Sequence, residues 1–558
     1  MTKKESLTGH VKWVADWQTF SLSQQLTGNL NGEAKTVLMS YLEQIFFDLY
    51  NFLQKQVGIS KPVPLEQLAK RFSSSHLRDY PEKTIVEVMK EIIEEIAPHA
   101  VNVASPYFIG HMTAAIPFFM IHFQAVVAAL NQNVVKLETS GVVSLRERQV
   151  LAQIHRAIYA KPETFYQEHI QNFNSTLGGF VEDGTLANLT ALWVARNVLL
   201  KPKKGFAGVE QEGMAAAYKA YNIERCVVLV SQLGHYSLWK VAGVLGIGHQ
   251  NVLPIEVDQN HRINIDQLRL TINTLQQEQP TTKILAVVGI AGATETGTID
   301  PLATLAEICA ENQIHFHVDA AWGGPTLLSA KYRHLLAGIE QADSVTIDGH
   351  KQFYMPMSCG MVYFKDPNLM KVITYHAHYI TRPGSADLGI RSLAGSREAT
   401  SLILGSALEI MGAKGYAQLI EYGIEMAQQF AQEIEKRYLF ELITPPQLNI
   451  LTYGICPSYI RKAWKKANTK QKQSLIEHLD YINCVVQQRQ KEAGNSFVSR
   501  TTLKRPAHLG GNRKVLRAVI MNPMTNIDII REILDEQEQI YKKYFKLNHG
   551  TDKPGPAG

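Results

Sequence analysis

The sequence predicts an α/β protein with a mainly parallel sheet flanked by helices. From about residue 173 onward, short runs rich in β-branched residues alternate with helical stretches, as in parallel strands joined by crossover helices. The strand-like runs are residues 226–231, 284–290, 314–319 and 344–347. The first hundred or so residues show helical periodicity instead, most clearly at 34–56 and 82–97. We therefore expect a separate helical part at the N-terminus.

Four segments are expected along the chain. Residues 1–120 form an N-terminal helical segment, and residues 121–400 form a large domain that contains the parallel sheet. Residues 401–546 form a smaller C-terminal α+β domain, because an apolar, strand-like run at 515–521 follows a long helical run. Residues 547–558, which end in Pro-Gly-Pro-Ala-Gly, are expected to form a disordered tail.

Composition and charge limit the classes of function. The 558 residues are 45% hydrophobic and 19% charged, which fits a large enzyme with a sizeable core. A net charge of +5 is small for this length and does not favour nucleic-acid binding. The apolar stretch 114–130 is interrupted by Pro117, His122 and Gln124, so we expect a buried helix there and no membrane partner.

The cysteines and the N-terminus indicate a compartment. The five cysteines are scattered without the spacing of disulfides or metal ligands. The first residues are polar, so no secretory signal is expected. Together these features predict a cytoplasmic protein without a metal site.

Two strand ends carry the residue types of an aldehyde cofactor site. Lys351 follows the strand-like run at 344–347, and Asp319 ends the run at 314–319. A lysine can form a Schiff base with pyridoxal phosphate, and a carboxylate can keep the pyridine nitrogen protonated. Taken singly, such residues are commonly a solvated charge or a turn former. Their joint arrangement is what predicts the cofactor, since loops beyond the carboxyl ends of parallel strands gather in one crevice.

A glycine turn before a predicted helix supplies a candidate phosphate site. The turn contains Gly184 and Thr185, whose backbone N–H groups and hydroxyl would face an anion at the helix N-terminus. The same Gly-Thr pair is also typical of a simple helix cap. Both interpretations stay open on this motif alone.

Taken together, residues 182–192, 315–324 and 342–351 resemble the group II pyridoxal-dependent decarboxylases, the family of glutamate, aspartate, cysteine-sulfinate and aromatic amino acid decarboxylases. The resemblance runs from about residue 105 to about residue 523. It implies a fold type I pyridoxal-phosphate enzyme and a homodimer whose active site is completed at the subunit interface. One departure is Asp183, which stands where the family's phosphate turn has its first glycine.

The resemblance also implies roles for individual residues. Lys351 would hold the cofactor, Asp319 would pair with its ring nitrogen, and His235 would stack over the ring. The remaining cofactor contacts would be Gly184, Thr185, Thr294 near the ring oxygen, Ala321 on the other ring face, and Ser344, Thr346 and His350 completing the phosphate cradle.

Proton delivery and substrate binding are assigned in the same way. Tyr379, rather than the less well matched Tyr375, would donate the proton at Cα after carbon dioxide leaves, although a buried loop aromatic is the alternative. Arg517 would grip a substrate carboxylate, with a structural ion pair as the alternative, because its planar fork suits two parallel hydrogen bonds. Gly110 and His111 would line the substrate pocket.

The expected activity is α-decarboxylation of an acidic L-amino acid. Aspartate giving β-alanine leads, because the pattern is nearest to the bacterial aspartate decarboxylases of the family. Glutamate giving 4-aminobutanoate and cysteine sulfinate stay open as substrates. Other fold type I reactions, such as those of lyases or aminotransferases, and an inactive scaffold homologue are the remaining alternatives.

Overall fold

The structure is a computed structural model that describes residues 59, 63–80, 82–83, 85–376, 387–503 and 511–546. The chain divides into two compact units. One unit comprises residues 1–108 and 488–497, and the other comprises residues 109–487 and 498–558.

The described part of the first unit is helical. It contains α4 (Leu65–Ala69), α5 (Ile85–Glu91) and the short turns η1 (Lys70–Phe72), η2 (Ile92–Ile96) and η3 (Ala97–His99). The helical run expected at 82–97 is confirmed from Ile85 onward, whereas the run expected at 34–56 lies outside the described residues.

A seven-stranded sheet is the framework of the second unit. Its strands are β1 (Gly178–Val181), β2 (Arg225–Ser231), β3 (Val252–Ile255), β4 (Thr282–Ile290), β5 (His315–Asp319), β6 (Ser344–Asp348) and β7 (Gly360–Phe364). They lie in the order β1-β7-β6-β5-β4-β2-β3, parallel from β6 to β3, with β7 and β1 antiparallel at one edge. The four strands expected from the sequence are confirmed as β2, β4, β5 and β6.

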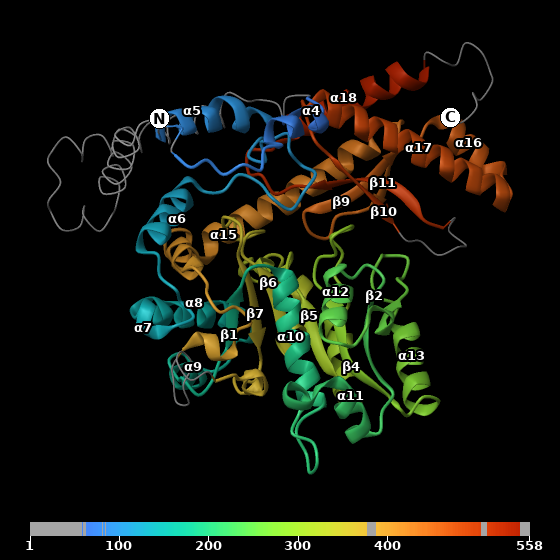
Figure 1. Ribbon diagram of the computed structural model, residues 1–558. Helices are drawn as coiled ribbons and strands as arrows, with labels where there is room; N and C mark the ends of the chain where they lie inside the picture. The colour runs from blue at the N-terminus through green and yellow to red at the C-terminus, as the bar shows by residue number, and fades with distance from the viewer. Residues whose placement is uncertain are drawn as a thin grey trace, which may run out of the picture. The chain divides into compact units, whose positions relative to one another are not determined.

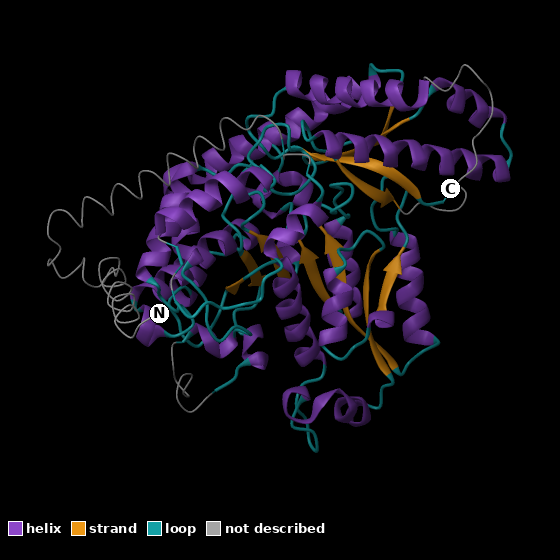
Figure 2. Ribbon diagram, turned by 45° about the horizontal axis from the view of Figure 1, so that its top comes forward, coloured by secondary structure: helices purple, strands orange, loops and turns teal. Residues whose placement is uncertain are grey.

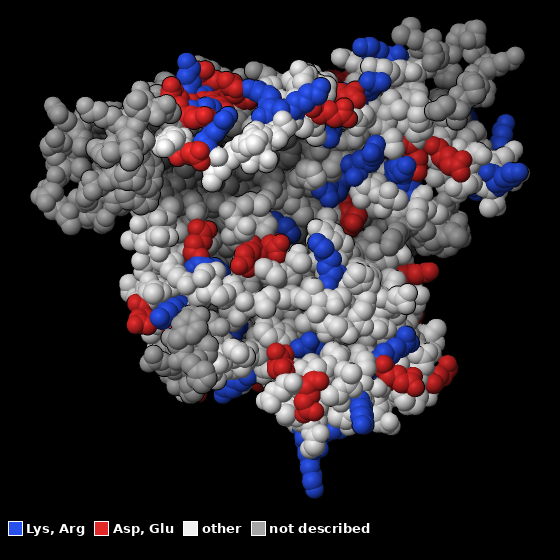
Figure 3. Space-filling view, in the orientation of Figure 1, with Lys and Arg blue, Asp and Glu red and all other residues white. Residues whose placement is uncertain are grey.

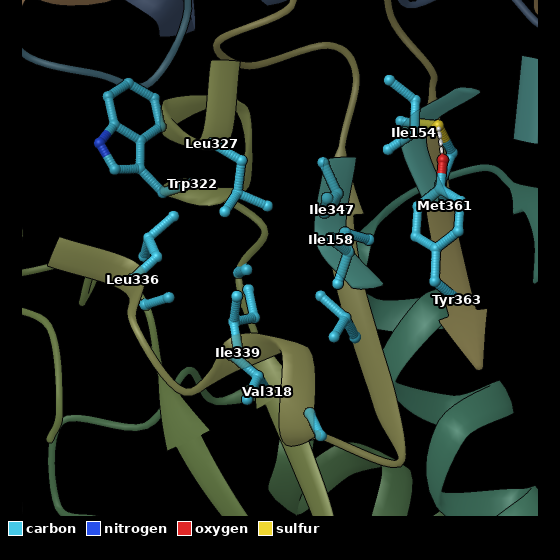
Figure 4. Close-up of a cluster of buried hydrophobic side chains, with 14 of the residues drawn as sticks. Ile154, Ile158, Val318, Trp322, Leu327, Leu336, Ile339, Ile347, Met361 and Tyr363 are labelled. Carbon is cyan, nitrogen blue, oxygen red and sulfur yellow. Dashed lines mark hydrogen bonds between the residues drawn. The ribbon is translucent and has the colours of Figure 1, made fainter. Parts of the chain in front are cut away.

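Helices cover both faces of this sheet because its strands are apolar on both sides. In β2, Val227 and Leu229 pack in one core, and Val228 and Val230 pack in the other. Figure 1 shows α10 and α12 in front of the sheet, and Figure 4 shows part of the core on the opposite side, around Trp322. The longer helices in this part of the second unit are α6 (Phe118–Leu130), α8 (Val142–Tyr159), α10 (Gly184–Leu199), α11 (Val209–Tyr221), α12 (Ser237–Val244), α13 (Ile265–Gln277), α14 (Leu302–Asn312) and α15 (Thr400–Glu435). Shorter elements are α7 (Leu137–Ser140), α9 (Glu163–His169), η4 (His249–Asn251), η5 (Gly324–Leu328), η6 (Arg333–Leu336), η7 (Ile339–Gln341), η8 (Leu369–Ile373) and η9 (Leu388–Arg391).

One expectation for this region needs correction. The apolar stretch 114–130 was expected to be a buried helix, yet α6 buries only Met120 and Val127. Phe118 and Val126 are about half exposed on the same helix. Among the described residues, no helix is both long enough and apolar enough to cross a membrane.

A smaller antiparallel sheet follows in the C-terminal part of the second unit. Its order is β10-β11-β9-β8, and Figure 2 shows long helices beside it. The strands are β8 (Phe440–Thr444), β9 (Ile450–Ile455), β10 (Ser499–Leu503) and β11 (Arg513–Val519). The helices are α16 (Ser458–Lys466), α17 (Thr469–Ala493), α18 (Ile527–Tyr541) and η11 (Lys542–Lys546), and the last six residues of α17 belong to the first unit. The strand expected near residue 515 is confirmed as β11. The expected domain boundaries at residues 120 and 400 stay predictions, and the tail at 547–558 lies outside the described residues.

Candidate active site

The carboxyl ends of three neighbouring strands meet at one pocket. The register pairs Ile290 at the end of β4 with Asp319 at the end of β5, and β6 beside them ends at Asp348. All three residues line a cavity of about 210 Å³. That volume equals the share of about seven water molecules in the liquid, which suits a small ring with its substituents.

Most of the predicted site residues lie on the wall of this pocket. The structure brings together eight of them from segments far apart in the sequence: Gly184, Thr185, His235, Thr294, Asp319, Ala321, His350 and Lys351. Tyr379 lies outside the described residues. Tyr375, its less well matched substitute, is 76% exposed and is not part of the pocket wall.

Lys351 is paired with a carboxylate that the sequence analysis did not single out. Its Nζ atom lies 2.9 Å from Oδ2 of Asp348, and Nε2 of His350 lies 3.8 Å from the same oxygen. Burial by itself lowers the pKa of Lys351, but Asp348, together with Asp319 and Asp183, raises that pKa above its ordinary value. The apoprotein therefore holds Lys351 as an ammonium ion, and it must lose a proton before it can attack an aldehyde.

Asp319 is held as an acceptor by two donors. Its Oδ2 accepts a hydrogen bond from Nδ2 of Asn188 at 2.9 Å, and its Oδ1 accepts one from the backbone N–H of Ala321 at 3.2 Å. Both oxygens of the Asp319 side chain are therefore held in position, and the side chain is placed as a partner for a protonated ring nitrogen.

The N-terminus of α10 forms one wall of the pocket. Asp183 is its N-cap residue, and Oδ1 of Asp183 accepts from the backbone N–H of Leu186 at 3.0 Å. The residue that departs from the family pattern therefore has a structural role as a helix cap. Glycine suits the next position, because a Cβ atom on Gly184 would stand only 2.9 Å from Oδ2 of Asp348 and that carboxylate would have to move.

These residues fit pyridoxal phosphate. The first turn of a helix has unpaired backbone N–H groups, so Gly184 and Thr185 can hold a phosphate, helped by the positive charge of Lys351. Lys351 supplies the amine for the aldehyde, and Asp319 supplies the anion for the ring nitrogen. Among the residues that the structure describes, no cluster of three or more His, Cys, Asp or Glu side chains could hold a metal ion.

His235 contributes a neutral ring to the pocket. Its Nδ1 atom lies 2.9 Å from Oγ of Ser237 and 3.4 Å from the backbone N–H of the same residue. Burial is the main cause of a lowered pKa, although Asp319 acts in the opposite direction. The ring is therefore an uncharged, flat surface at the pocket wall.

Two of the predicted cradle residues do not reach the pocket, which corrects their expected role. Ser344 is fully buried at the amino end of β6 and hydrogen-bonds to His315 at 2.8 Å and to His317 at 2.9 Å. Thr346 is also fully buried, in the middle of the strand. The cause is strand geometry, since only Asp348, the last residue of β6, reaches the carboxyl end that opens into the pocket.

The predicted substrate-binding residues lie beside the pocket rather than on its wall. Nη1 of Arg517 donates to the carbonyl oxygen of Thr294 at 3.0 Å, and Nη2 donates to that of Gly110 at 2.9 Å. Nε of Arg517 has no hydrogen-bond partner within the described part of the chain. From the 110–112 segment it is Met112, rather than Gly110 or His111, that lines the pocket.

Several residues of the pocket wall were not predicted from the sequence. Asn188 lies one helical turn after Gly184, and that i, i+4 spacing was the available signal. Asp348 lies in the same 342–351 segment as Lys351, but no pattern in that segment singled it out as a site residue. The remaining missed residues are Met112, Leu233, Tyr236, Ile290, Gly292 and Trp322.

Comparisons with known proteins agree with this geometry. Residues 69–455 match the family model described as the pyridoxal-dependent decarboxylase conserved domain. The chain is 44% identical over 493 residues to an aspartate 1-decarboxylase of Aliivibrio fischeri, a match that covers 88% of this chain and 89% of that relative. It is 30% identical over 405 residues to an L-aspartate decarboxylase of Metarhizium robertsii, which covers 70% of this chain and 74% of that relative.

A solved structure shows the same fold. It is the glutamate decarboxylase domain of a diaminobutyrate-pyruvate transaminase and L-2,4-diaminobutyrate decarboxylase from Vibrio parahaemolyticus. The TM-score is 0.76 at 19% sequence identity, and the match covers 95% of this chain and 99% of that chain.

Proposed function

The chain belongs to the pyridoxal-dependent decarboxylase family, and from this premise we propose that its substrate is L-aspartate and its product β-alanine. The family makes the protein a pyridoxal-phosphate-dependent carboxy-lyase that acts on an amino acid. The single observation that carries the choice of aspartate is the 44% identity to an aspartate 1-decarboxylase over 88% of this chain.

Different residues of the pocket are proposed to bind different parts of the cofactor. When bound, pyridoxal phosphate withdraws electrons from the substrate's Cα, so that the bond to the carboxylate can break. Lys351 would supply the amine that binds the cofactor's aldehyde group, and Asp319 would pair with its ring nitrogen. The backbone N–H groups at the N-terminus of α10, at Gly184, would hold its phosphate. His235 and Ala321 would lie against its ring and exclude water from the substrate.

Arg517 is the proposed anchor for a substrate carboxylate. It is buried beside the pocket, and its bond to the carbonyl of Thr294 ties it to a residue of the pocket wall. The unpartnered Nε–H leaves one donor for an acceptor. A guanidinium with a free donor next to the cofactor favours an acidic substrate over an aromatic one. Tyr379 remains the proposed acid that returns a proton to Cα.

A homodimer in the cytoplasm completes the proposal. α6 exposes Phe118, Val126 and Leu130, an apolar surface that a second copy of the chain would cover. All five cysteines are free, as expected for a reducing compartment. Figure 3 shows Lys and Arg side chains mixed with Asp and Glu over the visible face, which does not favour a nucleic-acid partner.

Carbon dioxide release tests the proposed substrate. The cofactor-loaded protein is given aspartate, glutamate, cysteine sulfinate or an aromatic amino acid, and the amine product is identified. The Lys351→Ala protein serves as the blank. Release from aspartate with formation of β-alanine is the expected result. Faster release from glutamate or cysteine sulfinate would reject aspartate as the substrate but keep Arg517 as the anchor. Release from the aromatic amino acid alone would reject both aspartate as the substrate and Arg517 as the anchor.

A further inference from the structure

A continuous chain of buried hydrogen bonds runs beneath the pocket. Nε2 of His315 lies 2.8 Å from Oγ of Ser344, and that oxygen lies 2.9 Å from Nδ1 of His317. Nε2 of His317 lies 2.9 Å from Oδ1 of Asn188. The chain thus connects β5 and β6 to α10, which carries the phosphate turn at its start.

At Asn188 the chain divides toward two pocket residues. One branch is the bond from Nδ2 of Asn188 to Oδ2 of Asp319, at 2.9 Å. The other is the contact from the same nitrogen to Oγ of Ser237 at 3.3 Å, and Ser237 in turn lies 2.9 Å from Nδ1 of His235. One amide therefore bonds Asp319 directly and reaches His235 through a single hydroxyl group.

The directions of these bonds follow from the chemistry of the groups. The amide of Asn188 donates through Nδ2 and accepts through Oδ1, so Nε2 of His317 must carry a hydrogen. Burial lowers the pKa of His317 to about 4, so the ring is neutral at physiological pH and its Nδ1 accepts from Ser344. The Ser344 oxygen must then accept from Nε2 of His315. Each group in this branch has one assignment.

The second branch fixes the tautomer of His235. Because Ser237 accepts from Asn188, its hydroxyl hydrogen is available for Nδ1 of His235, which also faces the backbone N–H of Ser237. Nδ1 is therefore the lone-pair nitrogen, and the hydrogen of the neutral ring sits on Nε2. His235 acts toward the pocket as a hydrogen-bond donor and not as a base.

We propose that Asn188 and His317 are positioning residues that lock the Asp319 carboxylate and the His235 ring into one arrangement, with His235 as the Nε2–H tautomer. This inference rests on the proposed roles of Asp319 and His235 toward the cofactor. Beyond those roles, we infer that Asp319 and His235 are coupled through Asn188 on α10, and that the coupling extends to Ser344, which does not line the pocket.

Substitutions of His317 test the coupling, with His155 as the matched control. His155 is also fully buried, and both of its ring nitrogens form hydrogen bonds, one with Tyr166 and one with the carbonyl of Phe364. It is not part of the series of hydrogen bonds that ends at Asp319 and His235. The measurements are the dissociation constant of pyridoxal phosphate from the apoprotein, the absorption maximum of the bound cofactor without substrate, and the melting temperature.

His317→Leu is expected to weaken cofactor binding about tenfold, the usual effect of weakening a hydrogen bond to a charged group, and to shift the absorption maximum. His317→Gln keeps an N–H that reaches Asn188 and should recover most of both losses. His155→Leu should lower only the melting temperature. If His317→Leu changes the melting temperature alone, the coupling is wrong.

Two further measurements separate the possible failures. Asp319→Asn tests the proposed role of Asp319, and an unchanged cofactor affinity in this variant would reject that role. If Asp319→Asn loses cofactor affinity while His317→Leu keeps it, only the coupling is rejected. Nitrogen-15 NMR of the wild-type apoprotein reads the tautomer of His235 directly, and the His235→Asn variant serves only to assign the signal. A protonated Nε2 on His235 is expected, and a protonated Nδ1 would overturn the inference.

Discussion

Nζ of Lys351 forms a 2.9 Å ion pair with Oδ2 of Asp348, three residues earlier in the chain. Asp348 is buried, Lys351 is partly exposed, and Oδ1 of Asp348 has no hydrogen-bond partner among the described residues. Asp348 thus depends on the ammonium group of Lys351 for its charge balance. Lys351 must lose a proton before its amine can attack an aldehyde, and Asp348 opposes that loss because it raises the pKa of Lys351.

Asp348→Asn should make cofactor attachment easier. Removing the carboxylate lowers the pKa of Lys351, which Asp348 raises against the effect of burial, so more of the amine is unprotonated at a given pH. The pH profile of the attachment rate, followed by absorbance after mixing apoprotein with pyridoxal phosphate, should move to lower pH. Asp366→Asn, on a surface turn, is the control, and a profile that stays in place would remove Asp348 from this role.

Gly184→Ala should weaken retention of the cofactor about tenfold, as expected when a charged hydrogen bond in the phosphate cradle is distorted. The added Cβ would stand 2.9 Å from Oδ2 and 3.1 Å from Oδ1 of Asp348, so that carboxylate has to move. Gly179→Ala on β1 is the control, since a Cβ there meets nothing within 4 Å. Equilibrium dialysis of the cofactor measures the effect, and equal retention by both variants would contradict it.

Arg517→Lys should raise the KM for the acidic substrate about tenfold while leaving the absorption of the bound cofactor unchanged. An ammonium group cannot reproduce the planar set of donors that bonds to Thr294 and Gly110 and that we propose binds the substrate. Arg513→Lys is a matched control, because Arg513 is buried on the same strand and pairs with Glu441 at 2.7 Å. If both variants lose only stability, Arg517 is a structural residue.

The apoprotein should lose stability as the pH falls from 6.5 to about 4. Burial lowers the pKa of both His155 and His317 from 6.5 to about 4, so the unfolded chain binds more protons than the folded chain in that window. The two neutral histidines contribute fully to the free energy of unfolding above pH 6.5. By about pH 4 that free energy has fallen by on the order of 3 kcal/mol per histidine. Urea unfolding at each pH measures it. His155→Gln should flatten the curve, and an unchanged slope in that variant would refute the assignment.

The strands of the large sheet were predictable because each is a continuous apolar run. In β2 and β4 nearly every residue is buried, so the β-branched pattern alone located them. α6 was misjudged for a related reason. Its residues are as apolar as those of a core helix, so the composition predicts burial, but Phe118 and Val126 are about half exposed in the structure.

The parallel strands, the positions of Asp319 and Lys351 at or just after strand ends, and the glycine turn at Gly184 could be predicted from the sequence. These features are local, since backbone conformation and residue type within a few positions decide them. The hydrogen bonds of Ser344 to His317, of Asn188 to both Asp319 and Ser237, and of Arg517 to Gly110 could not be predicted in this way. Each of these contacts joins residues that are 27 to 407 positions apart. No local pattern encodes such contacts, because they depend on how the strands and helices pack.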